Sequence, residues 1–450
     1  MATRYWVLGT GTFNTTNTAN FAAISGAAVS DGLGFASTDD IVFDSGSGSG
    51  FTVTIAATGP TIRNLTITGV SGMTLAGAVA WAFQGNLDLP ATGLTWSANG
   101  TCAVTGSANS TLMTRGVTIG CIINTNKSGG ASVTLLDALI LGSTRNLVVT
   151  AGVFDAGVYA VTCQNVSSNN TNARTLNGSG NWTVMGSGGS AFNLGGSNLT
   201  TGLSAANIIM SAATAKTFSG LGKTFGKLTQ GGAGILTVAG TGTTLNDIGN
   251  TTQPATIRFT AGETFNIVAW SLAGTAGNLI TVNSTDIVTP VIATLSKPSG
   301  TVTANYTSIQ AITATGGATW NASNGTNTDA GSNTNWIFTS GSSYPIAGSG
   351  SGSATGATAA IKRTFYFTGS GGGSATGAAG SITSITPIYF GGTGGGSATG
   401  ATANIILGNA TRPIAGSGSG SATGSATFTG SSVVTSGGGP FLIFKRRRRI

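Results

Sequence analysis

Short apolar runs recur along residues 41–340 and constrain the fold more than any other feature of the chain. Runs such as FTVTIAA, TIRNLTITGV, NLVVTAGVF and ATIRFTAG alternate in part between apolar and polar residues and are bounded by Gly, Asn, Ser or Asp. This pattern is typical of strands that present one dry face and are joined by tight turns. The runs return about every 10 residues within a longer interval of about 20, which indicates a repeating β architecture.

The arrangement of these strands is open to a sandwich, a propeller or a solenoid. Hairpin signals are sparse, and the main ones are Asn99-Gly100, Asp31-Gly32, Asn177-Gly178 and Asn324-Gly325. A parallel β-helix needs turns and stackable Thr, Asn and Val residues rather than tight hairpins. We therefore expect an all-β chain that forms an elongated parallel β-helix-like solenoid.

Composition supports an ordered β protein. The chain is 40% hydrophobic and 7% charged, whereas disordered chains combine low hydrophobicity with high net charge. It has 74 glycines, no histidine and a single glutamate, Glu263, so long helices are disfavoured. Its 450 residues exceed the roughly 250–300 that one globular core accommodates, which favours growth in one dimension.

The chain divides into four predicted segments. Residues 1–45 are an aromatic N-terminal cap or attachment segment, 46–340 a β-helix-like rod, 341–435 a Gly-rich repetitive β region, and 436–450 an apolar-then-basic tail. In the third segment GSATG recurs at Gly352, Gly373, Gly396 and Gly420, with apolar strands between the copies. A flexible linker has no reason for such spacing. Gly-rich strands suit closely packed backbones, so we expect a homotrimer rather than a monomer.

The positive charge is concentrated at the C-terminus. Of the formal net charge of +8, five charges come from Lys445, Arg446, Arg447, Arg448 and Arg449. The rest of the chain is nearly neutral, which argues against specific nucleic-acid binding. The five cations are candidate contacts for an anionic partner, such as lipid or lipopolysaccharide phosphates or an acidic protein face. A solvated tail is the alternative.

Catalytic, metal and cofactor sites are not expected. Only eleven carboxylates are present, and most stand in turns beside Gly, Asn or Thr. Asp39 and Asp40 are adjacent, so on a strand they point to opposite faces. Asp137 and Asp155 are the best available pair for glycan cleavage, but a role as turn or rung residues is favoured.

Other motifs also favour structural interpretations. Without histidine, Ser-His-Asp and Cys-His sites are excluded, and a zinc site is not expected. Cys102, Cys121 and Cys163 are interpreted as buried small apolar residues. The near-duplicate KTFSG and KTFGK segments at residues 216–220 and 223–227 are interpreted as a coil repeat rather than a phosphate loop. The tryptophans favour core or trimer packing over sugar stacking.

Several segments carry a resemblance. The start RYWVLGTGTFNTTNTANF, the following STDDIVFD and the later TTQPATIRFTAGETFNI resemble a group of bacteriophage and bacterial β-helical proteins. The chain has Leu8 where that group usually has Gly, and Phe13 and Phe21 where it usually has Trp. The Gly-rich segment resembles repeats of tailed-phage fibre-like and decoration proteins. The resemblance implies a virion or surface structural protein.

These observations lead to a functional prediction. We expect a virion structural protein of a tailed bacteriophage, a tail fibre or spike-like component for host-surface attachment. Its partners would be copies of itself, other tail or capsid proteins, and a host glycan or lipopolysaccharide. No signal peptide is recognisable, so assembly into the virion would take place in the host cytoplasm. The alternatives are a capsid decoration protein or head fibre, a polysaccharide-degrading tailspike and, with less support, a bacterial adhesin.

Overall fold

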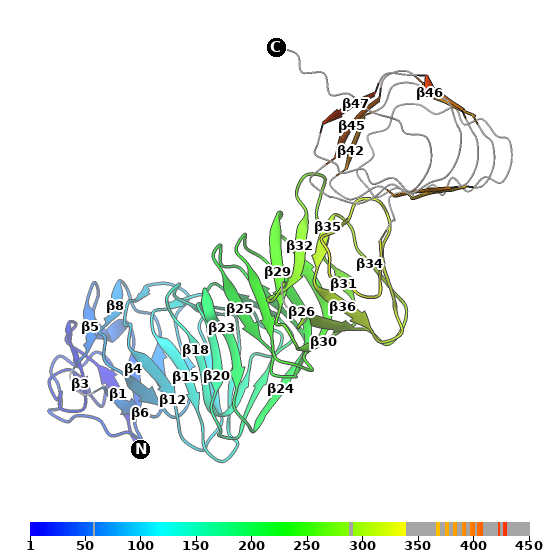
Figure 1. Ribbon diagram of the computed structural model, residues 1–450. Helices are drawn as coiled ribbons and strands as arrows, with labels where there is room; N and C mark the ends of the chain where they lie inside the picture. The colour runs from blue at the N-terminus through cyan, green and yellow to red at the C-terminus, as the bar shows by residue number, and fades with distance from the viewer. Residues whose placement is uncertain are drawn as a thin grey trace, which may run out of the picture. The chain divides into compact units, whose positions relative to one another are not determined.

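The computed structural model describes residues 1–56, 59–287 and 291–338, together with the backbone of eight strands between residues 366 and 429. The chain forms two compact units, residues 1–338 and 339–450, which are described separately. Figure 1 shows the first unit as a stack of short strands, running from blue at the N-terminus to yellow. The described residues are strands, turns and one 3-10 turn, η1 (Ser45–Ser47).

The first unit has three faces, each a ladder of strands from successive coils. Face 1 contains β1 (Thr3–Trp6), β4 (Asp40–Phe43), β7 (Leu65–Ile67), β10 (Leu87–Asp88), β13 (Ser110–Met113), β16 (Ser132–Leu135), the second half of β18 (Leu147–Asp155), β21 (Arg174–Asn177), the first parts of β24 (Leu199–Met210), β26 (Thr224–Gln230) and β28 (Thr244–Asn250), and then β30 (Thr264–Ile267), β33 (Ala293–Ser296) and β36 (Ile312–Thr315).

Face 2 begins with a separate four-stranded ladder and continues, after a break, as a second ladder. It contains β2 (Gly11–Phe13), β5 (Thr52–Ile55), β8 (Met73–Ala76) and β11 (Leu94–Trp96), then β14 (Thr118–Ile119), β17 (Leu139–Leu141), β19 (Val161–Cys163), β22 (Asn181–Val184), the second parts of β24, β26 and β28, and β31 (Trp270–Ser271).

Face 3 is continuous along the unit. It contains β6 (Thr61–Ile62), β9 (Trp81–Phe83), β12 (Thr101–Val104), β15 (Ile122–Asn126), the first half of β18, β20 (Val166–Asn169), β23 (Gly188–Gly195), β25 (Lys216–Ser219), β27 (Leu236–Ala239), β29 (Ala255–Phe259), β32 (Ile280–Ser284), β35 (Thr307–Gln310) and β38 (Thr328–Asp329). The remaining strands are β3 (Phe21–Ala22) and a small sheet of β34 (Thr301–Thr303), β37 (Thr319–Ala322) and β39 (Trp336–Phe338).

The named strands of all three faces pair in parallel, and the unit is a β-solenoid of about 13 turns. The prediction of an all-β, parallel β-helix-like solenoid is therefore confirmed. Lys216 and its register partner Leu236 are 20 residues apart in the sequence, whereas Ile280 and its partner Thr307 are 27 apart. Coil length therefore varies, mainly through the corner turns. The antiparallel pairing of β1 with β3 interrupts this pattern near the N-terminus.

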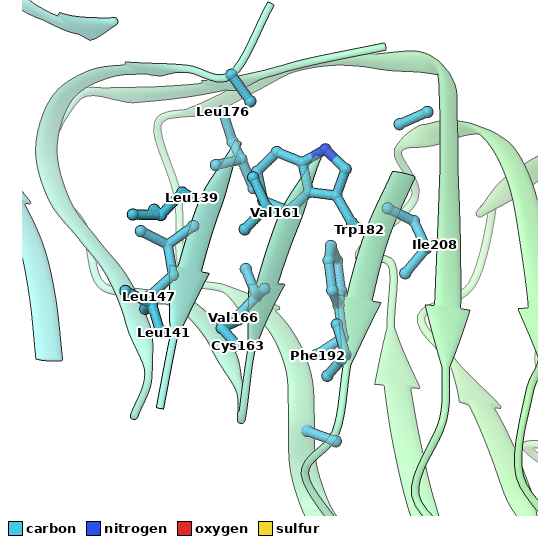
Figure 2. Packing of buried hydrophobic residues seen from close by; sticks show 14 of the residues in the cluster. Leu139, Leu141, Leu147, Val161, Cys163, Val166, Leu176, Trp182, Phe192 and Ile208 are labelled. Carbon is cyan, nitrogen blue, oxygen red and sulfur yellow. The ribbon is translucent and has the colours of Figure 1, made fainter. Parts of the chain in front are cut away.

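Period-two alternation places one side of each strand in a single dry core. In β18, Leu147, Val149 and Phe154 are buried, while Val148 and Val153 are partly exposed. Figure 2 shows the middle of this core, where Cys163 and Trp182 pack among leucines and valines of neighbouring coils. Burying a side chain of this size contributes about 1.5–3 kcal/mol, so the stacked apolar columns hold the coils together.

The cross-section changes where β24 turns from one face to another. Arg174 pairs with Leu199 in face 1, and Trp182 pairs with Ile208 in face 2, so the 12-residue β24 serves both. β26 and β28 likewise serve both faces, since Phe225 pairs with Leu203 and Leu228 with Ile208. From β29 on, strands follow in the order face 3, face 1, face 2 until β34 starts the small C-terminal sheet.

The N-terminal segment is built around aromatic residues. Trp6 packs edge-on against Phe21 at 5.2 Å and tilted against Phe43 at 5.3 Å between ring centroids. Phe13 lies 6.3 Å from Trp6, and all four rings are buried. The phenylalanines at positions 13 and 21, where the resembling group usually has Trp, therefore fill this end of the core. The predicted boundary after residue 45 falls within η1, and β1 and β4 are both strands of face 1.

The second unit also contains parallel ladders. β40 (Tyr366–Gly369) pairs with β43 (Tyr389–Gly392); β41 (Ser374–Gly377), β44 (Ser397–Gly400) and β46 (Ala422–Thr423) form a second ladder; β42 (Ser381–Ser384), β45 (Ala403–Leu407) and β47 (Ala426–Thr429) form a third. Two copies of the SATG segment align residue for residue, Ser374 with Ser397 and Gly377 with Gly400. The repeat thus recurs at equivalent register positions.

Candidate functional site

The carboxylates singled out as the best catalytic pair cap turns. Both oxygens of Asp137 accept hydrogen bonds from the preceding coil: Oδ1 from Thr114 N at 2.9 Å and from Thr114 Oγ1 at 3.1 Å, and Oδ2 from Arg115 N at 2.5 Å. Asp155 Oδ1 accepts from Gly157 N at 2.9 Å. In the ladder, Asp155 lies opposite Thr134 rather than Asp137. The structure therefore gives each carboxylate its own corner.

Arg115 connects the same corner to the coil before it. Its guanidinium donates to Asp88 and to the carbonyl oxygen of Leu89. Its backbone has a φ of 46°, in the left-handed region that is costly for a residue with a side chain. The hydrogen bond that the Arg115 backbone N–H donates to Asp137 helps to hold this conformation. Asp88, Arg115 and Asp137 therefore form a column of charges across three coils.

The adjacent Asp39 and Asp40 also have separate partners. Asp40 forms an ion pair with Arg63 on the next coil and accepts from Asn64 Nδ2 at 2.7 Å. Asp39 accepts from Ala2 N at 2.7 Å and from Ala36 N at 3.0 Å. The net effect is a lowered pKa for Asp39: burial opposes the shift, but these amides and nearby positive charge outweigh it. Both aspartates fix the N-terminal segment to the stack.

The two KTF segments lie on neighbouring faces of one coil, not in successive coils. Lys216 begins β25 on face 3, and Thr224 begins the part of β26 that lies on face 1. The repeat points Phe218 and Phe225 into the core, where their rings meet edge to face at 4.9 Å. The interpretation as a repeat between successive coils is therefore corrected: the two segments, seven residues apart, lie on either side of one corner.

Three buried cations are the main polar feature that the sequence pattern did not reveal. Lys127, Arg174 and Lys216 are only 2–3% exposed, and no described carboxylate forms an ion pair with any of them. Burying an unpaired charge is costly unless hydrogen bonds replace its hydration. Each of the three obtains those bonds mainly from backbone carbonyl groups at a corner.

Lys127 lies at the corner between faces 3 and 1. Its Nζ donates to the carbonyl oxygens of Gln84 and Thr105, both at 2.6 Å, and to Ser110 Oγ at 2.5 Å. Burial lowers the pKa of Lys127 to about 8. A lysine beside a serine hydroxyl is also the arrangement of Ser-Lys nucleophiles. Here Ser110 is itself 1% exposed and the ammonium group already donates three hydrogen bonds. The pair therefore stabilises the corner and is not accessible to a substrate.

Arg174 occupies the same corner two coils later. Its guanidinium donates to Ser168 Oγ at 2.7 Å, to Asn172 O at 2.9 Å and to Ser197 O at 2.6 Å. It also donates to Ser168 O and Gly195 O. Burial lowers the pKa of Arg174. The planar group thereby joins its own coil to the next one.

Lys216 performs a similar role at the corner between faces 2 and 3. Its Nζ donates to Ala212 O at 2.7 Å and, more weakly, to Gly234 O at 3.2 Å. Burial lowers the pKa of Lys216 to about 8. The three cations thus stabilise contacts between coils through hydrogen bonds and do not form a binding site for a ligand.

The cysteines are buried and free, as the sequence predicted. Burial raises the pKa of Cys163 to about 12 and that of Cys102 well above its usual range, which keeps these thiols protonated and unreactive. In the described residues, no group of three or more His, Cys, Asp or Glu side chains could hold a metal ion. No helix in the same part of the chain is long and apolar enough to cross a membrane.

The candidate anion-binding cations, Lys445 and Arg446 to Arg449, lie outside the described residues. Comparison of the chain with protein-family models, with curated proteins and with solved structures finds no match.

Proposed function

We propose that this chain is a structural protein of a tailed-phage virion, a fibre or spike-like rod that contributes to host-surface attachment. The observation that carries the proposal is the solenoid itself, whose parallel ladders and continuous dry core run through about 13 turns. Each coil contributes hydrogen bonds to two neighbours, so stability is distributed along the rod. Such a body suits a mechanical role.

The polar groups support this choice over catalysis. Asp137 and Asp155, the pair considered for glycan cleavage, hold backbone amides of corner turns. Lys127 and Lys216 hold carbonyl groups between coils. These contacts stabilise the rod, so a polysaccharide-degrading tailspike is the less favoured function.

Within the virion, the proposed partners are other copies of the chain, in a trimer, and neighbouring tail proteins. The five cations from Lys445 to Arg449 would contact an anionic partner, either a lipopolysaccharide or an acidic protein face. The resemblance of the Gly-rich segment to decoration proteins keeps a capsid decoration protein or head fibre as the alternative.

Immunogold electron microscopy of intact particles tests the proposal. Antibodies raised against residues 1–338 should label purified tailed particles from a host that carries the gene, with gold at the tail. Gold over the head would favour the decoration alternative. Absence of the polypeptide from mass spectra of purified particles would refute the virion assignment.

A further inference from the structure

Face 3 is one of two faces that run along the unit without a break. Its ladder extends from β6 to β38 and that of face 1 from β1 to β36, whereas face 2 is interrupted between β11 and β14. At about 4.8 Å between neighbouring strands, the part from β6 to β35 is roughly 53 Å long. A continuous sheet surface therefore accompanies the first unit over most of its length.

The outward side of this surface is almost without charge. In the face-3 strands from β6 to β38, the only charged residues are Lys216, which is buried, Arg258, and Asp329 at the C-terminal end of the ladder. One outward column begins with Thr61, Ala82 and Ala103 and ends with Asn193, Ser219 and Ala239. By contrast, Asp88 and Asp155 stand on face 1, and Lys227 and Asp247 on face 2.

We propose that face 3 is the surface through which copies of this chain pack side by side. This inference rests on the proposed assembly of the rod from several copies and names the surface that the assembly uses. Small uncharged side chains allow two backbones to approach closely, and the lack of fixed charge leaves no electrostatic selection for a different partner. A second copy has the same length and the same strand spacing, so its ridges match along the whole surface.

The size of the surface fits this partner. Strands of about four residues give it a width of roughly 13 Å, and hence an area of roughly 700 Å² per chain before the corners are added. A stable interface of standard size buries about 800 Å² on each partner. A short peptide would cover only a fraction of the face.

Sedimentation velocity of the full chain tests the proposal. We expect the wild type to sediment as several copies. The variant Ala103→Arg/Ser167→Arg places like charges on face 3, and its mass should fall to that of one 44.0-kDa chain. The matched variant Thr162→Arg/Thr183→Arg places the same charges at half-buried outward positions of face 2 and should keep the wild-type mass. A monomeric wild type, or a face-3 variant that stays assembled, would overturn the proposal.

A second measurement covers the case in which the arginines unfold the chain. A nitroxide attached to Val148→Cys should give a shorter distance between copies in pulsed dipolar spectra than one attached to Thr183→Cys, because Val148 points outward on face 3. The native cysteines are buried and do not compete for the label. Equal distances, or a shorter one from position 183, would contradict the proposal. Neither experiment depends on whether the chain is found in virions, so the two proposals can fail independently.

Discussion

Lys127 Nζ lies 2.6 Å from the carbonyl oxygen of Gln84, 43 residues earlier in the chain. Gln84 follows β9 and Lys127 follows β15, with β12 between them in the ladder of face 3. A single side chain thus joins coils that are not nearest neighbours. Most contacts of the solenoid join adjacent coils, so this contact, like those of Arg145 with Asn99 O and of Asn246 with Ser204 O, extends cooperativity beyond one coil.

Replacing Lys127 with methionine should destabilise the rod by about 2–4 kcal/mol, because two buried carbonyl groups lose their shared donor while the apolar stem is kept. Urea unfolding followed by circular dichroism measures this loss. Lys223→Met, in a partly exposed turn, is the matched control and should change stability by less than about 0.5 kcal/mol. Equal losses of unfolding free energy for the two substitutions would refute the role of Lys127 in stabilising contacts between coils.

The same lysine should give stability a specific pH dependence. Burial lowers its pKa to about 8 from 10.5, so between these values the unfolded chain binds the proton and the folded chain releases it. The wild type should therefore gain stability relative to Lys127→Met as pH rises from 8 to about 10.5, with no change in the difference below pH 8. Cys163, whose raised pKa of about 12 weakens the fold at high pH, is present in both proteins and cancels. A difference that stays constant from pH 7 to pH 10 would contradict the shift.

The buried cations show where the sequence pattern falls short and what signal it nevertheless contains. Arg174 has the same strand parity as Leu176, and Lys216 the same parity as Phe218, so alternation alone directs both side chains inward. A positive charge, however, ordinarily indicates the surface. The partners are carbonyl groups of other coils, and their positions depend on coil lengths that no local pattern specifies. Apolar alternation and sparse hairpin signals are sufficient for the solenoid, because they depend only on neighbouring residues.

Leu8 provides a test of backbone strain. Its φ is 66°, a left-handed conformation, and its side chain is 54% exposed. The resembling group usually has Gly at this position. We expect Leu8→Gly to stabilise the protein by about 0.5–1 kcal/mol, because relief of roughly 1–2 kcal/mol of strain exceeds the entropy gained by the unfolded chain. Leu33 is 55% exposed without a left-handed φ, so Leu33→Gly should destabilise. Thermal unfolding of both variants decides whether the two changes differ in sign.

Gly226 should not tolerate a side chain, because the ladder is irregular beside it. Register shifts between Leu203 and Asn207, and a Cβ on Gly226 would lie 2.5 Å from the carbonyl oxygen of Ala206. Backbone has to move to make room, so Gly226→Ala should cost about 1–3 kcal/mol. Gly189→Ala is the control, since nothing lies within 4 Å of its Cβ. Similar urea midpoints for the two variants would show that the bulge adapts freely.

Substitution of the corner carboxylates Asp137 and Asp155 distinguishes a structural role from a catalytic one. Asp137 accepts three hydrogen bonds from Thr114 and Arg115, whereas Asp155 accepts one from Gly157. Asp137→Ala should therefore cost about 2–3 kcal/mol and Asp155→Ala about 0.5–1.5 kcal/mol, as measured by urea unfolding. A glycan-cleaving pair would behave differently: either substitution would abolish release of reducing sugar from host polysaccharide, and stability would change little. If both residues cap turns, the two variants lose stability unequally and the wild type releases no sugar. Sugar release by the wild type that both variants lose would overturn this structural assignment.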